Sequence, residues 1–177
     1  MNPRSWRFTS RALLSVLVSA LLLGAAANAE AQARKTVHFT GVNQEISSNF
    51  YPVGDPADGH FFGVSVRRGL TTFDTGETGM ASSVEYIDVV KGVGTTAGYA
   101  TITFVDGSSF TARIENHFSI GPKGLVTASI KTEYVKGTGR FEGIKGTEVI
   151  TGRQISTTND FAGFFFLEGT ATYTLPR

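Results

Sequence analysis

The chain contains no cysteine among its 177 residues. This absence excludes disulfide bonds, a lipid anchor attached to cysteine and a cysteine nucleophile. An exported form of the chain must therefore be held together by its apolar core alone. The 14 phenylalanines and five tyrosines supply enough large side chains to build such a core.

Several signatures of catalytic and cofactor chemistry are also missing. The three histidines, His38, His60 and His117, are scattered and do not have the spacing of a metal site. There is no Gly-x-Ser-x-Gly motif for a serine nucleophile. The glycine-rich stretch from Gly137 to Gly146 lacks the Gly-Lys-Ser/Thr of a phosphate-binding loop. We therefore expect no metal site, and we expect no cofactor.

The N-terminus has the three parts of a secretory signal peptide. Three arginines precede an uncharged apolar run from Ala12 to Ala27, and small residues follow that run. The run is short for a membrane span of ~20 residues. We predict that residues 1–29 are a signal peptide, that residues 30–177 form one domain, and that the protein is secreted or periplasmic. Cleavage after Ala29, Ala31 or Ala33 remains open.

Removal of the leader changes the sign of the charge. A cut after Ala29 leaves 13 of the 16 basic residues against 15 acidic ones, a net charge of −2. A domain so close to neutrality has no electrostatic footprint for nucleic acid, and no basic amphipathic helix is present for a membrane surface. We expect neither nucleic acid nor, after signal removal, a membrane as partner.

No window of a dozen residues carries a capped helical stripe, whereas period-two alternation between turn clusters is found almost everywhere. The sequence therefore predicts an all-β protein. A closed barrel removes the exposed edges of its strands, and consecutive hairpins favour a single closed antiparallel eight-stranded up-and-down barrel. Loops are expected at 43–60 and 75–81. The predicted strands are 35–40, 61–68, 70–75, 82–91, 98–105, 109–120, 125–136, 147–155 and 161–175.

Alternation also predicts which side chains face the interior. The expected inward sets are 110, 112, 114, 116, 118 and 120, then 126, 128, 130, 132 and 134, and finally 84, 86, 88 and 90. In the last run Ile87 and Val89 make the other face apolar too. Polar groups on these apolar faces are site candidates, because a carboxylate in an apolar cavity has a raised pKa and can act as an acid or a base.

The candidate catalytic residues are Asp88 and Tyr134. The candidate ligand-binding residues are Tyr86, Asn116, Phe110 and Phe118. An alternative remains open for the polar candidates, in which they face solvent or close hydrogen bonds inside a filled core.

The segment from Phe161 to Leu167 is apolar on both faces, which is typical of a strand buried on both sides. In a barrel its outer side must then meet a subunit or a covering segment. We therefore expect a homodimer or a homotrimer.

The stretch from Gly137 to Ile155, GTGRFEGIKGTEVITGRQI, resembles the signature of the allene oxide cyclase barrel family, which is related to the dirigent proteins. The shared features are a Gly-x-Gly-x-Phe corner, a short glycine-bearing step and a strand. The resemblance covers 98–175. It implies an eight-stranded barrel with an apolar cavity, often in a trimer or dimer.

Two classes of function remain open. The first is a cavity protein that binds a small hydrophobic or aromatic ligand and, as an enzyme, steers its cyclisation or coupling. Such an isomerase- or cyclase-like enzyme would use neither a metal nor a nucleotide cofactor. The second is a non-catalytic structural or interaction barrel with a filled core. A void between Phe110, Phe118, Phe141 and Tyr134 would favour the first class, and their packing across the axis would favour the second.

Overall fold

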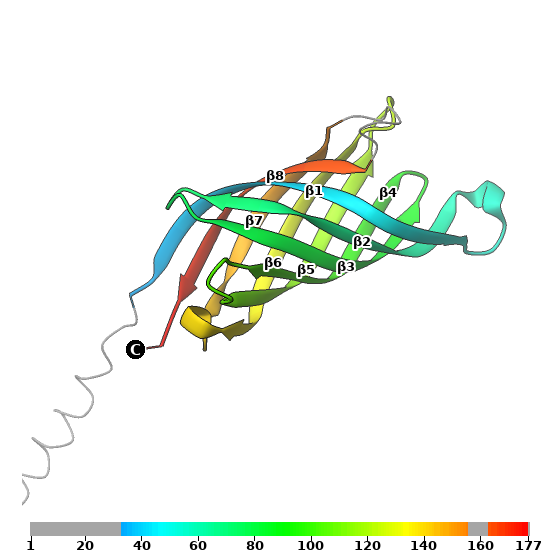
Figure 1. The fold of residues 1–177 in the computed structure, drawn as a ribbon. Coiled ribbons are helices and arrows are strands. Elements are labelled where there is room, and N and C mark those ends of the chain that lie inside the picture. Colours follow the sequence, from blue (N-terminus) through cyan, green and yellow to red (C-terminus); the bar gives the residue numbers. More distant parts are fainter. Residues whose placement is uncertain (1–32, 156–162, 177) are drawn as a thin grey trace, which may run out of the picture. The chain divides into compact units, whose positions relative to one another are not determined.

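The computed structural model describes residues 33–155 and 163–176, so the predicted signal peptide lies outside the described residues. Eight strands form a closed barrel in chain order, with every neighbouring pair antiparallel (Figure 1). The predicted fold class is confirmed. Within the described part of the chain, no helix is long and apolar enough to cross a membrane. The strands are β1 (Lys35–Pro52), β2 (His60–Phe73), β3 (Thr78–Val90), β4 (Val93–Thr103), β5 (Ser109–Ile120), β6 (Val126–Thr138), β7 (Lys145–Gln154) and β8 (Phe164–Thr174).

The long first hairpin is the main departure from the predicted strands. β1 continues to Pro52 through most of the segment expected to be a loop, because its backbone pairs with β2 as far as Phe61. Two strands predicted on either side of Gly69 are one strand, β2, since Gly69 pairs with both Asn43 and Ala81. Backbone pairing with neighbouring strands therefore overrides a sequence that is polar in β1 and glycine-bearing in β2.

The second half of β1 leaves the barrel wall. β1 pairs with β8 from Lys35 to Gln44, and a bulge follows between Glu45 and Ser47. Beyond the bulge, β1 and β2 run on as an arm that ends in a short 3-10 helix, η1 (Pro56–Asp58) (Figure 1). A bulge bends a strand and increases its twist. The bend carries the arm away from β8.

Aromatic rings fill one end of the barrel, which we call the closed end. The ring of Phe110 lies 5.0 Å from that of Tyr134 and 5.2 Å from that of Phe141. Phe104 stacks on Phe141 at 5.1 Å. Stacked and edge-to-face pairs of this kind add to the free energy gained by burial. Phe39 and Phe73 belong to the same buried cluster, so this end has a packed core.

The glycine-rich corner forms this end. After β6 the chain makes a 3-10 turn, η2 (Gly139–Phe141), and both Phe141 and Ile144 are buried against the cluster. Gly137 lets the chain pass over itself, since a Cβ on it would lie 1.8 Å from the carbonyl oxygen of Phe141. Gly143 has φ +72, a left-handed conformation that favours glycine.

The predicted inward faces are confirmed for most of β5 and β6 but are wrong for β3. Phe110, Ile114 and Tyr134 are buried, whereas Ile120, at the end of β5, is 43% exposed. In β3, Val84, Tyr86 and Val90 are about half exposed and Asp88 is also on the outer wall. Instead, Ser83, Glu85 and Ile87 point inward. The expectation that the more apolar face of a strand points inward fails for β3, because the barrel interior there contains charged groups such as Glu85.

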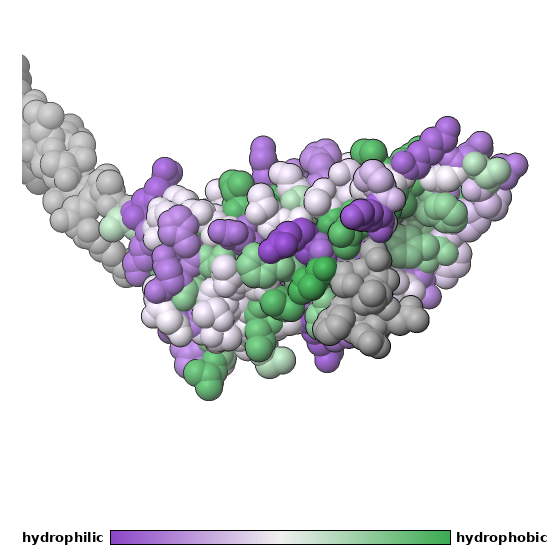
Figure 2. All heavy atoms as spheres, turned by 90° about the horizontal axis from the view of Figure 1, so that it is seen from above, coloured by the Kyte–Doolittle hydropathy of each residue, from purple (hydrophilic) through white to green (hydrophobic). Residues whose placement is uncertain are grey.

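Hydrophobic side chains also reach the surface elsewhere. Figure 2 views the barrel from above relative to Figure 1, so that the side formed by β1 and β8 faces the reader. This side shows a hydrophobic stripe flanked by polar groups. The first four residues of β8, 164–167, are apolar on both faces. Phe165 is buried inside, whereas Phe166 lies outside under the guanidinium of Arg153 at 5.2 Å. Phe161, part of the predicted strand, lies outside the described residues.

The corner can be tested with two glycine substitutions. We expect Gly137→Ala to lower the free energy of unfolding by about 2–3 kcal/mol, because a Cβ cannot coexist with the Phe141 carbonyl. Gly121→Ala is the matched control, since its Cβ would meet no heavy atom closer than 3.5 Å. Urea unfolding of both variants measures the difference. Equal destabilisation would contradict the close approach.

Candidate functional site

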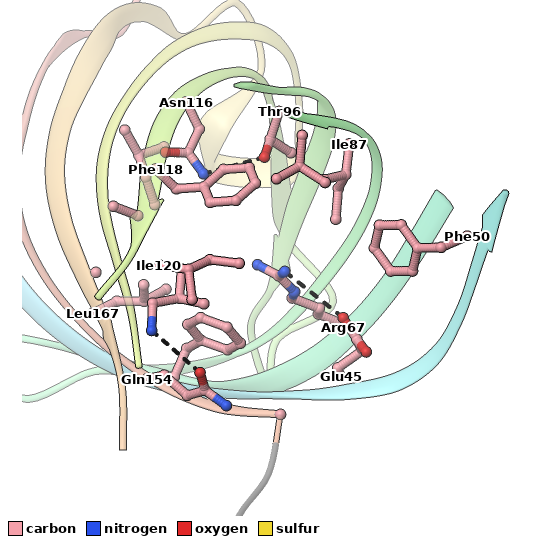
Figure 3. A pocket seen from close by; sticks show the side chains of 17 residues that line it. Glu45, Phe50, Arg67, Ile87, Thr96, Asn116, Phe118, Ile120, Gln154 and Leu167 are labelled. Carbon is pink, nitrogen blue, oxygen red and sulfur yellow. Dashed lines mark hydrogen bonds and ion pairs between the residues drawn. The ribbon is translucent and has the colours of Figure 1, made fainter. Parts of the chain in front are cut away.

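A cavity occupies the end of the barrel opposite the aromatic cluster. Its outer chamber has a volume of about 250 Å³, and an inner chamber of about 80 Å³ lies deeper and shares Arg67, Asn116 and Phe165 with it. Figure 3 shows Arg67 reaching into the outer chamber from β2, opposite Phe118 and Asn116 of β5. The apolar walls come from four strands and the arm. They consist of Phe50, Ile87, Val89, Phe118, Ile120, Val126, Ala128, Ile130, Phe165 and Leu167.

Among the described residues that line the two chambers, Arg67 carries the one positive charge. Its guanidinium lies 3.8 Å from a carboxylate oxygen of Glu45 and 3.5 Å from one of Glu85. The same group stands over the ring of Phe165, 4.5 Å from its centre. A flat, weakly hydrated cation suits both contacts. Two carboxylates therefore surround one cation, and the cluster has a formal charge of −1.

Hydroxyl groups hold the two carboxylates in place. Ser48 and Ser65 donate hydrogen bonds to Glu45 at 2.7 and 2.8 Å. Ser83 donates to Glu85 at 2.7 Å. Hydrogen bonds to an ionised group are the stronger kind, and they compensate part of its desolvation. Hydrogen bonds therefore fix the carboxylates of the charged cluster in the cavity wall.

Among the described residues that line the cavity, three buried polar atoms have no hydrogen-bond partner, and one of them is Oδ1 of Asn43 in the inner chamber. The amide nitrogen of Asn116 donates to Thr96 Oγ1 at 3.4 Å, but its Oδ1 is buried and unpartnered. Nε of Arg67 is also buried without a partner. Leaving such groups unsatisfied costs about 1–3 kcal/mol each. Two open acceptors and one open donor therefore flank the cavity.

The inner chamber ends at a buried carboxyl group on β7. Glu148 accepts hydrogen bonds at 2.7 Å from the hydroxyls of Thr132 and Tyr134. Burial raises the pKa of Glu148 despite these two bonds, which act in the opposite direction. Burial, followed by the charge of Glu148, raises the pKa of the Tyr134 hydroxyl. The group at the inner end of the cavity is therefore a carboxyl that retains its proton above the usual pH range.

The structure brings some of the sequence-predicted residues to the cavity. Asn116 and Phe118 line the outer chamber, and Phe110 joins the inner chamber to the aromatic cluster. Tyr134 lines neither chamber and touches the site through Glu148. The roles of these residues stay predictions.

Tyr86 and Asp88 lie outside the cavity, so their predicted place inside it is wrong. Tyr86 stacks on Phe62 at the outer surface with ring centres 6.4 Å apart, and it is 56% exposed. Asp88 pairs with His60 at 2.8 Å on the same surface. Strand β3 presents its apolar side outward, which reverses the face that alternation alone favours.

Sequence reasoning missed the charged residues of the site. Glu45 falls in the segment expected to be a loop, and Glu85 falls on the face of β3 expected to be outside. Glu148 could have been found, since it alternates with Ile150 on the inward face of β7. Arg67 has no such signal, because an inward arginine is expected only when its acidic partners are known.

The arrangement supports binding with orientation. The apolar walls remove an aromatic ring from water, while Arg67 and Asn116 offer a donor and an acceptor to a polar substituent. Glu148, with its raised pKa, is suited to donate a proton at the inner end. Among the described residues, no group of three or more His, Asp or Glu side chains is placed to hold a metal ion.

The raised pKa of Glu148 predicts a pH dependence of stability. The native state binds this proton more tightly than the unfolded chain, whose reference pKa is 4.5. The resulting stabilisation is complete below that value and is lost as pH rises through the native pKa. We expect the unfolding free energy of the wild type, relative to Glu148→Gln, to fall as pH rises from about 4.5, by at most about 1.4 kcal/mol per pH unit.

Urea unfolding at about pH 4.5, 6 and 8 measures this difference. Glu115→Gln on the outer wall of β5 is the matched control, and its curve should run parallel to the wild-type curve. A Glu148→Gln curve that also runs parallel to the wild type would contradict a raised pKa.

Comparison of the chain with protein-family models and with curated protein sequences finds no significant match. Among solved structures it is similar to two pterocarpan synthase dirigent proteins. GePTS1 gives a TM-score of 0.52 at 16% identity, over 82% of this chain and 90% of the other. PsPTS1 gives a TM-score of 0.51 at 15% identity, over 82% and 97%. The chain therefore has the eight-stranded barrel fold of dirigent proteins, as the resemblance of its glycine corner predicts.

Proposed function

We propose that this barrel binds a small, uncharged, aromatic or otherwise hydrophobic molecule in its cavity and steers its cyclisation or coupling. The observation that carries the proposal is the two-chamber cavity, which is apolar along its walls and polar at Arg67, Asn116 and Glu148. Its size lies at the lower end of the ~300–1,000 Å³ typical of ligand pockets. A compact ring compound suits this volume better than a long lipid chain.

The charges beside the cavity favour an uncharged ligand. Arg67 already faces Glu45 and Glu85, and a ligand carboxylate would bring a third negative charge to one cation. Repulsion between like charges is strong where water is scarce. A hydroxyl group, in contrast, accepts from Nε of Arg67 or donates to Oδ1 of Asn116, two of the buried atoms that lack partners among the described residues.

The proposed mode of action is confinement. A rigid cavity that holds a reactive molecule in one conformation removes much of the entropic cost of ring closure. Glu148 would supply a proton at the inner end, and Thr132 and Tyr134 would position its carboxyl group. The reaction class rests on analogy of fold with two proteins described as pterocarpan synthases.

The setting of this function is also proposed. The N-terminal segment has the pattern of a signal peptide, so we infer that the mature protein acts in the periplasm or outside the cell. We further infer that it acts as a homodimer or homotrimer. The filled aromatic end supports an alternative, in which the barrel is a non-catalytic interaction module and the cavity binds nothing.

The first test blocks the cavity. Ala128 lines the outer chamber, while its neighbour Thr127 points to solvent on the same strand. We expect Ala128→Phe to weaken binding of 1-naphthol at least about tenfold, because the new ring fills the chamber. Thr127→Phe adds the same ring outside and should leave binding unchanged.

Fluorescence titration measures binding, and circular dichroism confirms that both variants fold. Equal binding by the two variants, or none by the wild type, would contradict the proposal. The second result would favour the non-catalytic alternative.

The second test addresses ligand charge. We expect 1-naphthol to bind at least about tenfold more tightly than 1-naphthoate, which has the same rings and a carboxylate. Glu85→Gln should reduce this difference in affinity by strengthening 1-naphthoate binding, since it removes one of the two negative charges beside Arg67. Glu115→Gln on the outer wall is the control. A preference for naphthoate in the wild type would overturn the assignment of an uncharged ligand.

A further inference from the structure

The wall formed by β2, β3 and β4 has its apolar side on the outside. Along β3 the inward positions include Ser83 and Glu85, whereas Val84 and Tyr86 point outward and are 51% and 56% exposed. Leu70 of β2 and Tyr99 of β4 are exposed in the same way. We call this surface the outer β2–β4 face. Its large apolar side chains are Phe62, Val64, Val66, Leu70, Met80, Val84, Tyr86, Val90, Val93 and Tyr99.

The strand register makes this face continuous. Val66 lies opposite Val84, which in turn lies opposite Tyr99, and Val64 lies opposite Tyr86. Side chains directly opposite each other on neighbouring strands are in contact range. The rings of Phe62 and Tyr86 are stacked. A connected apolar surface of this size on a soluble protein marks an interaction site.

The opposite wall does not share this character. The outward positions of β5 to β8 include many charged side chains, namely Arg113, Glu115, Lys131, Glu133, Arg153 and Glu168. On the outer β2–β4 face, Arg68 and Asp88 are the outward Asp, Glu, Lys or Arg side chains of the three strands. The outer β2–β4 face therefore carries fewer charged side chains than the wall formed by β5 to β8.

We propose that the outer β2–β4 face binds a second copy of this chain around a two-fold axis. The axis lies in the plane of the contact and runs across the strands. It crosses β2 at Ser65 and β3 at Glu85, two residues that are opposite each other in the strand register. The inference is independent of ligand binding. It places the self-contact on β2–β4, whereas the sequence pattern points to β8.

The charges on the face select this arrangement. Arg68 lies three residues after Ser65 on β2, on one side of the axis. Asp88 lies three residues after Glu85 on β3, and because the strands are antiparallel it lies on the other side of the axis, opposite Phe62. Rotation about the proposed axis therefore brings Arg68 of each copy beside Asp88 of the other, one strand spacing of ~4.8 Å to the side. Arg68 has no ion-pair partner among the described residues of its own chain. An axis parallel to the strands would instead oppose Arg68 to Arg68.

The size of the face is close to that of one side of a standard dimer interface. The three strands have 14, 13 and 11 residues. With a rise of ~3.4 Å per residue and a spacing of ~4.8 Å, they cover on the order of 600 Å² before side-chain relief is counted. A standard interface buries about 800 Å² per partner. The face therefore approaches the usual area, with aromatic anchors near its centre.

The experiment measures the mass of the mature full-length domain by sedimentation and light scattering. We expect the wild type to have twice the mass of one chain, and Tyr86→Glu to be monomeric or to dimerise at least about 100-fold more weakly. Val149→Glu is the matched control, since Val149 is 60% exposed on the outer wall of β7. Circular dichroism establishes that both variants fold.

Charge exchange tests the axis. Arg68→Asp and Asp88→Arg should each weaken the dimer about tenfold or more, and the double variant should recover it, because the pair is restored with its signs reversed. A monomeric wild type or a dimer that Tyr86→Glu leaves intact would overturn the proposal. A trimer, or a double variant no better than the single ones, would overturn the two-fold arrangement.

Discussion

The ion-pair cluster of Arg67 with Glu45 and Glu85 sets the character of this barrel. Removing three charged groups wholly or partly from water is costly unless each is paired or hydrogen-bonded, and serine hydroxyls bind both carboxylates here. This requirement turns the polar sides of β2 and β3 inward. The apolar sides of the same strands are then forced to the outside, because successive side chains point to opposite faces.

The same cluster keeps one half of the interior open. Phenylalanine rings interdigitate and fill the closed end, whereas the other end has a charged group in the middle of its space. Phe118 contributes its ring as a wall, and Gly94 makes room for it, since a Cβ there would lie 2.5 Å from the ring. The barrel thus combines a packed half, which supplies stability, with a hollow half, which is available to a ligand.

Much of this architecture is readable in the sequence where pattern and environment agree. β5 and β6 alternate cleanly, and their inner faces are as predicted for most of their length. The glycine corner indicates both the fold and the burial of Phe141. β3 was not readable, since Ile87 and Tyr86 on opposite faces are both large and apolar. The polar, serine-rich half of β1 resembles a loop until its pairing with β2 is known.

The charged residues of the Arg67 cluster could not be predicted from alternation within one strand, because their positions depend on pairing between strands. Asn116 and Phe118 follow from alternation within one strand, but Arg67 is acceptable inside only because Glu45 and Glu85 come from two neighbouring strands. Glu148 likewise depends on hydroxyls from β6. Such groups are defined by contacts between strands, which a single sequence does not display.

A crystal structure of the mature protein soaked with 1-naphthol tests the central claim most directly. The account predicts density for the ring system between Phe118 and Phe165, with its hydroxyl near Arg67 or Asn116. Electron density for Tyr86 and Asp88 inside the barrel, or an interior filled by side chains at the Arg67 end, would contradict it.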